Sequence, residues 1–140
     1  MPGPQSELGS LMGVSLTVTK VLVIDDIKMM RIYLRRCLER ADYEVEEWVP
    51  LSAMEIPERL PGFAPDLIIS ESQLPGCNGA TMARMVRKVA PKASLLLLTP
   101  LRDPDMEANL LKLGVRQVLC KPVAPETLVQ AVKDALAVPA

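Results

Sequence analysis

Five side chains that suit a cation and a phosphoryl group follow apolar runs of the sequence. Asp25 and Asp26 come directly after one run, and Glu71 ends another. Thr99 ends a third run, and Lys121 follows a fourth. Carboxylate oxygens are the ligands that Mg²⁺ prefers, and an ammonium beside a hydroxyl suits phosphoryl oxygens. Each residue alone is ordinary turn or loop chemistry, so a site is predicted only if the fold brings all five together.

Five apolar runs alternate with five segments of helical periodicity, and this alternation supplies such a fold. It predicts an α/β protein with a doubly wound, five-stranded parallel sheet. In such a sheet the ligand site lies outside the carboxyl ends of the strands, near the point where the strand order reverses. The five polar side chains are therefore expected on one rim. The predicted strands are 21–24, 43–48, 67–70, 94–98 and 117–120, and the predicted helices are 30–41, 52–60, 80–89, 103–113 and 125–136.

Local signals refine three of these elements. Alternation of apolar and polar residues in 43–48 is typical of a strand near the edge of the sheet. Pro57 predicts a short or distorted helix in its segment. Asp103 and Pro104 form a capped start of the predicted helix 103–113, and Gly114 ends that helix.

Composition excludes several classes of function. The chain has 140 residues, 49% of them apolar, which predicts one globular domain. A formal charge of −1 with scattered signs gives no footprint for nucleic acid. The absence of histidine excludes a phosphohistidine carrier, a Ser-His-Asp triad and His-metal chemistry.

The same composition predicts a cytoplasmic protein without a membrane segment. The longest aliphatic run is only residues 95–98, and no basic region precedes an apolar block near the N-terminus. The 3 cysteines have no metal-ligand spacing, so reduced thiols are the simplest interpretation. Residues 1–19 begin rich in Gly, Ser and Pro and are expected to form a flexible arm, with the folded domain in residues 20–138.

Residues 20–136 resemble the receiver domain of phosphorelay response regulators, which has a (βα)5, flavodoxin-like fold. The resemblance is carried by Val21–Asp26, Pro65–Gly79, Leu98–Thr99 and Cys120–Val123. It implies that Asp25 and Asp26 hold Mg²⁺ with the backbone carbonyl of Gln73. It also implies that Thr99 hydrogen-bonds a phosphoryl oxygen, that Lys121 pairs with the phosphoryl group, and that the bond before Pro122 is often cis.

Three residues depart from the family pattern. Glu71 occupies the position of the aspartate that accepts the phosphoryl group, four residues before Pro75-Gly76. Pro100 follows Thr99 where the family usually has a small residue, which stiffens the loop expected to close over the phosphate. Val118 stands where the family commonly has an aromatic side chain that swings inward on activation.

The extra methylene of Glu71 dominates the functional interpretation. Phosphoryl transfer depends on positioning, and a misplacement of about 1 Å costs on the order of a hundredfold in rate. The longer arm is expected to reach Lys121 and to imitate the phosphorylated contact without phosphate; the alternative is a vestigial site. Mg²⁺ binding is expected to be weak. Ser70 and Ser72 are poor substitute acceptors, because strand alternation aims them away from the pocket or along its edge.

The leading hypothesis is a non-enzymatic pseudo-receiver that acts through protein–protein contact. Its expected surface is residues 103–136, the face that the family uses for output and pairing, and its partner is a kinase, an output protein, a scaffold or a second copy. One alternative is a conventional Mg²⁺-dependent receiver phosphorylated at a nearby residue. Another is a Mg²⁺-dependent phosphohydrolase, which needs a second Asp two positions after its nucleophile; Asp25-Asp26-Ile27-Lys28 lacks that spacing. A third is a receiver segment of a longer kinase or transcription factor.

Overall fold

The computed structural model describes residues 18–49 and 52–138, so residues 1–17 of the expected arm lie outside the described residues. A single five-stranded sheet has the order β2-β1-β3-β6-β7, with every neighbouring pair parallel. This confirms the predicted doubly wound sheet. Its strands are β1 (Lys20–Ile24), β2 (Glu44–Trp48), β3 (Leu67–Glu71), β6 (Ser94–Thr99) and β7 (Gln117–Cys120).

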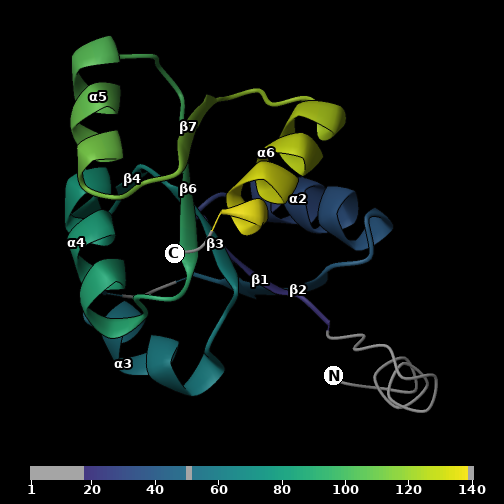
Figure 1. Ribbon diagram of the computed structural model, residues 1–140, viewed down its shortest axis with the longest axis horizontal. Helices are drawn as coiled ribbons and strands as arrows, with labels where there is room; N and C mark the ends of the chain where they lie inside the picture. The colour runs from purple at the N-terminus through teal and green to yellow at the C-terminus, as the bar shows by residue number, and fades with distance from the viewer. Residues whose placement is uncertain (1–17, 50–51, 139–140) are drawn as a thin grey trace.

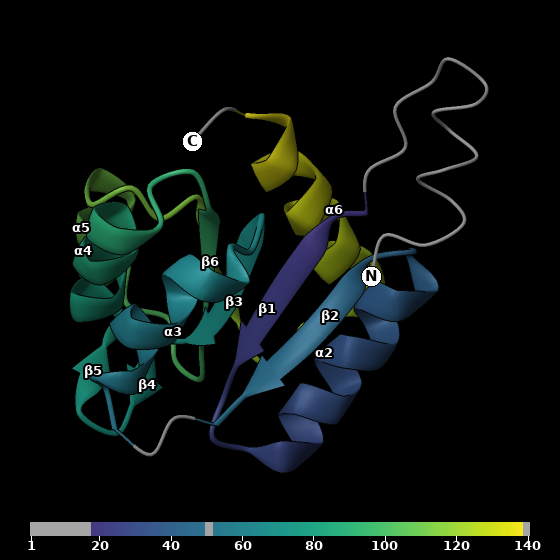
Figure 2. The ribbon, with the colours of Figure 1, turned by 90° about the horizontal axis from the view of Figure 1, so that it is seen from below.

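Helices cover both faces of this sheet, as Figures 1 and 2 show. One face carries α2 (Lys28–Arg40) and α6 (Pro125–Ala137). The other carries α3 (Glu55–Phe63), α4 (Gly79–Val89) and α5 (Pro104–Lys112). Within the described part of the chain, none of these helices is both long and apolar enough to cross a bilayer.

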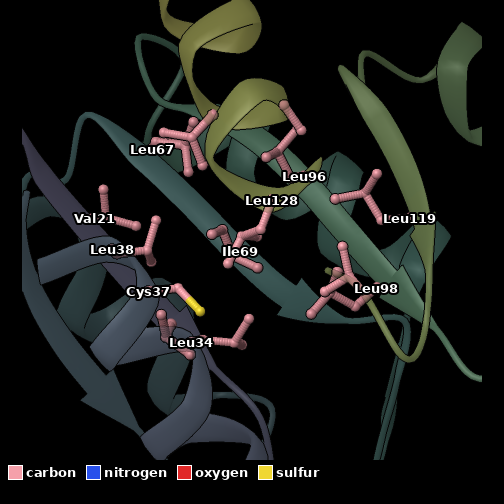
Figure 3. Packing of buried hydrophobic residues seen from close by; sticks show 14 of the residues in the cluster. Val21, Leu34, Cys37, Leu38, Leu67, Ile69, Leu96, Leu98, Leu119 and Leu128 are labelled. Atoms are coloured by element: carbon pink, nitrogen blue, oxygen red, sulfur yellow. The ribbon is translucent and has the colours of Figure 1, made fainter. Parts of the chain in front are cut away.

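The hydrophobic core is double because successive strand residues point to opposite faces of the sheet. Val21, Ile69 and Leu96 belong to the core under α2 and α6, where they pack with Leu34 and Leu128 (Figure 3). Their sequence neighbours on the strands belong to a second core under α3, α4 and α5, which includes Leu22, Ile68 and Leu97. Strands buried on both faces explain why the sequence shows continuous aliphatic runs.

A two-stranded hairpin between β3 and α4 was not predicted. It consists of β4 (Gln73–Leu74) and β5 (Cys77–Asn78), which pair antiparallel around the predicted Pro-Gly turn. Gly76 has a φ of 73°, a conformation that suits glycine. The Asn78 side chain then caps α4 by accepting a hydrogen bond from the Thr81 amide at 2.9 Å. The hairpin thus leads the chain directly from Glu71 into the next helix.

The expected helix at 52–60 is shifted toward the C-terminus, because α3 spans Glu55–Phe63. Pro57 falls in the first turn, where a missing amide costs no intrahelical bond. Pro61 lies inside the helix instead, and the helix ends two residues later with Ala64 in a left-handed conformation. The start of α5 is as predicted: the Asp103 side chain accepts from the Met106 amide at 3.1 Å, and Pro104 is the first helical residue.

Two glycines should respond in opposite ways to a methyl group. A Cβ at Gly62 in α3 would meet no atom within 4 Å, whereas Gly114 has a φ of 101°. Gly62→Ala should therefore stabilise the protein by about 0.5 kcal/mol or more, because alanine favours the helix. Gly114→Ala should destabilise it by about 1–2 kcal/mol through backbone strain. Urea unfolding measures both, and equal stability of the two variants would contradict this account.

Candidate functional site

The predicted site residues lie at the carboxyl edge of the sheet. Asp25 follows β1, and Glu71 is the last residue of the neighbouring strand β3. The strand order reverses between these two strands, because β2 pairs on the far side of β1. Thr99 ends β6 and Lys121 follows β7 on the other side of β3. The topology therefore places all four at the edge where doubly wound sheets hold their ligands.

The Lys121 ammonium lies between two buried carboxylates. Its Nζ is 3.0 Å from Asp25 Oδ2, and it also forms an ion pair with Glu71 Oε1. The side chains of Lys121, Asp25 and Glu71 are only 11%, 0% and 7% exposed. Water screens such a cluster weakly, so each charge depends on its partners. The ion pair expected between Glu71 and Lys121 is present.

Amides and a hydroxyl satisfy the remaining carboxylate oxygens. Asp25 Oδ1 accepts from the Ile27 amide at 2.8 Å. Glu71 Oε2 accepts from the Ser72 hydroxyl at 3.3 Å and from the Gln73 amide at 3.2 Å. In residues 18–49 and 52–138, no buried side-chain oxygen or nitrogen lacks a hydrogen-bond partner. The site is thus internally complete.

The carboxylates also determine the protonation of Lys121. Burial alone would lower the pKa of Lys121, but the hydrogen bonds to Glu71 and Asp25 outweigh burial, and the pKa is raised. A raised folded-state pKa gives stability that is fully present below the unfolded-state pKa. That stability is lost only as the pH rises through the folded-state value. The ammonium therefore persists at every pH near neutrality.

Thr99, Asp26 and Gln73 do not join this cluster as the resemblance implies. The Thr99 hydroxyl donates to the Leu101 carbonyl at 3.0 Å. It therefore bonds within its own loop, on the far side of Pro100, and not to the cluster. Asp26 is exposed, and its side chain forms no hydrogen bond or ion pair with the described residues. Gln73 contributes its amide to Glu71. The Lys121–Pro122 bond is cis.

Sequence reasoning missed a second layer of contacts around Asp25. Arg31, in the first turns of α2, donates to the Asp25 carbonyl at 2.8 Å and pairs with Glu47 at 3.3 Å. The sequence shows an arginine close after β1, but no local pattern gives its partners. Ser72 also lies closer to Glu71 than strand alternation predicts, since β3 ends at Glu71. Ser70 is fully buried and bonds to the backbone of Glu71.

With Lys121 in place, the arrangement suits an ammonium better than it suits Mg²⁺. Lys121 already holds one oxygen of Asp25 and one of Glu71, and the other oxygen of each accepts protein hydrogens. Among the described residues, no group of three or more His, Cys, Asp and Glu side chains could hold a metal ion. Mg²⁺ requires near-octahedral oxygen coordination, and Lys121 would have to leave Asp25 to permit it.

Comparison with known families agrees with this fold and site. The model of the response regulator receiver domain matches residues 21–133. The chain belongs to this receiver family. It is therefore a receiver domain of the two-component signalling type, and the resemblance inferred from the sequence is confirmed at that level.

Several individual proteins are similar to this receiver domain over nearly their whole length. Protein CcdB of Bacillus subtilis is 30% identical over 117 residues, which cover 82% of this chain and 95% of CcdB. The chemotaxis protein CheY of Thermotoga maritima is 26% identical over 112 residues, or 80% of this chain and 92% of CheY. The solved structure of CheY4 from Vibrio cholerae matches with a TM-score of 0.75 and 28% identity, over 85% of this chain and 99% of CheY4.

Removal of the Lys121 ammonium tests its structural role. Lys121→Met leaves Asp25 and Glu71 buried without a counter-charge, so the free energy of unfolding should fall by about 3 kcal/mol. The double variant Glu71→Gln with Lys121→Met should recover part of this loss, because one unpaired charge is gone. Chemical denaturation at neutral pH measures both. Lys133→Met, at an exposed lysine of α6, is the control. If Lys121→Met and Lys133→Met unfolded with the same free energy, the structural role of Lys121 would be refuted.

Proposed function

We propose that this receiver domain is a non-enzymatic interaction module that does not depend on phosphorylation. The contact between Lys121 and Glu71 is the observation that supports the proposal. The family resemblance implies that this lysine pairs with the phosphoryl group of an activated receiver. Here a carboxylate of the same chain provides the negative charge at that lysine, so the contact needs no phosphodonor.

The surroundings of Glu71 also make it a poor phosphoryl acceptor. Lys121 binds Oε1, and two donors bind Oε2, so neither oxygen is free to attack. The additional methylene displaces both oxygens from the position of the shorter side chain, and phosphoryl transfer tolerates little displacement. The Thr99 hydroxyl is already donated to Leu101. We infer that the domain has no catalytic turnover and that its Mg²⁺ affinity is only millimolar, because Lys121 competes for Asp25.

The output face is proposed to be the surface of α5, β7 and α6. A cleft of about 500 Å³ lies there, and its lining includes Arg102, Glu107, Val118 and Thr127. Val118, which lines this cleft, is smaller than the aromatic side chain that the family commonly has at this position. Leu111 adds a large apolar side chain that is 47% exposed. A cleft with mixed polar and apolar lining suits a protein partner, for which we propose a kinase, an output protein or a scaffold in the cytoplasm. A second copy is the alternative occupant.

A conventional receiver phosphorylated near Glu71 remains the second candidate function. The Ser72 hydroxyl favours it, because this hydroxyl contacts Glu71 Oε2 and is the nearest alternative nucleophile. The Ser72 side chain is buried, however, and no more than 2% of the residue is exposed. A phosphodonor would therefore reach it only after local opening.

Incubation with acetyl phosphate and Mg²⁺ should leave the intact mass of the protein unchanged. Glu71→Asp should gain one phosphoryl group in part of the population, because Asp25, Asp26, Thr99 and Lys121 are all present. Intact-mass spectrometry reads both outcomes. An adduct on the parent protein that disappears in Glu71→Ala would refute the proposal, and one that disappears in Ser72→Ala would establish the second candidate.

Partner affinity should follow the charges of the output face and not the phosphodonor. Lys112→Glu or Glu126→Lys, both at exposed positions, should weaken binding by about tenfold at low salt, mostly by slowing association. Thr99→Ala should change it little. Surface plasmon resonance with a purified partner, with and without acetyl phosphate, measures these effects. Loss of binding in a folded Thr99→Ala variant would mean that the pocket still controls the face.

A further inference from the structure

Tyr33 connects the helix that begins beside Asp25 to the loop that carries Lys121. Its hydroxyl donates to the carbonyl of Val123 at 2.6 Å, between residues 90 positions apart in the chain. Val123 lies two residues after Lys121, and its side chain is buried in the core under α2 and α6. The Tyr33 ring is partly buried against the same core. Figure 1 shows α2 and α6 on this face of the sheet.

The loop from Lys121 to Ala124 needs such a connection. It is fixed at one end where the Lys121 amide donates to the Thr99 carbonyl at 2.8 Å. At its other end the Ala124 carbonyl accepts from the Leu128 amide in α6 at 3.0 Å. Pro122 has no amide hydrogen to donate between these points. Within the described residues, Tyr33 is the side chain of α2 that hydrogen-bonds to this loop.

The same helix also holds the opposite partner of the ion pair. Arg31 donates to the Asp25 carbonyl at 2.8 Å, and the Ile27 amide donates to Asp25 Oδ1 at 2.8 Å. Arg31 and Tyr33 are two residues apart on α2. The N-cap and first turns of α2 therefore fix Asp25, and Tyr33 of the same helix fixes the backbone from which the ammonium reaches it. A side chain as flexible as lysine needs a fixed backbone to keep one geometry.

We propose that Tyr33 is a positioning residue for Lys121. Its hydrogen bond to Val123 holds the loop so that the ammonium reaches Asp25 and Glu71 together. Without that bond the middle of the loop loses its hydrogen bond to α2, and Lys121 exchanges its carboxylate contacts for water more often. Burial raises the pKa of the Tyr33 hydroxyl, and nearby Cys37 raises it further. The hydroxyl therefore remains a donor throughout the neutral range.

Tyr33→Phe tests the proposal, because it removes one hydroxyl and keeps the ring. Tyr43→Phe is the matched control: Tyr43 packs against the same core, and its hydroxyl forms no hydrogen bond with the described residues. The measurement is acetylation of the lysine amines by an N-hydroxysuccinimide ester, followed by peptide mass spectrometry. Exposed Lys92 and Lys133 serve as internal references.

Tyr33→Phe should increase the labelling rate of Lys121 several-fold relative to these references, and Tyr43→Phe should leave it unchanged. A purely structural hydroxyl would give a different result, because general loosening of the fold raises the labelling of every partly buried lysine, Lys20 included. Unchanged Lys121 labelling in folded Tyr33→Phe would overturn the proposal.

A second measurement rests on the proposed function. In the Glu71→Asp background, Tyr33→Phe should slow phosphorylation by acetyl phosphate several-fold, because Lys121 no longer meets the incoming group in place. An equal rate with and without the Tyr33 hydroxyl would count against the proposal. If Glu71→Asp alone accepts no phosphoryl group, a feature other than Glu71 also disables the pocket, and the labelling result alone decides the role of Tyr33.

Discussion

Two carboxylates buried at adjacent strand ends require a positive charge, and the Lys121 ammonium supplies it. Asp25 and Glu71 come from β1 and β3, which are hydrogen-bonded neighbours, so the sheet itself forces the two acids together. Leaving either one unpaired would cost several times the net worth of a surface ion pair. The loop after β7, its attachment to α2 and the first turn of α2 all serve to keep that ammonium in place. The site is best understood as a buried cluster in which one ammonium is shared by two carboxylates.

Much of this could be predicted from the sequence, for a simple physical reason. Strands buried on both faces must be continuously apolar, so runs such as residues 21–24 and 95–98 are conspicuous. Their alternation with helical segments predicts a doubly wound parallel sheet. The polar residue that ends each run is then placed at a known edge of the sheet. The contact between Glu71 and Lys121 was predicted from three things together: their positions at strand ends, the family resemblance and the length of the Glu71 side chain.

The features that the sequence did not reveal depend on short or distant interactions. The β4–β5 hairpin has two residues in each strand, too few for any periodicity. The direction of the Thr99 hydroxyl depends on the path of Leu101 beyond Pro100, which no local pattern encodes. The bond from Tyr33 to Val123 joins segments that only the complete fold brings together. Sequence patterns report the burial of elements well, but they do not report which hydrogen bond a polar side chain chooses.

The contact between Lys121 and Glu71 joins two side chains of one chain, so it has no chemical lifetime of its own. A phosphoaspartate is a labile acyl phosphate, a mixed anhydride that water or a phosphatase cleaves, and its decay acts as a timer. An intramolecular ion pair is renewed as fast as it opens, because its partners remain at high effective concentration. A signal carried by such a domain would therefore end only when the protein is degraded, or when a competitor displaces it from its partner. Its strength would be set by the number of copies in the cell.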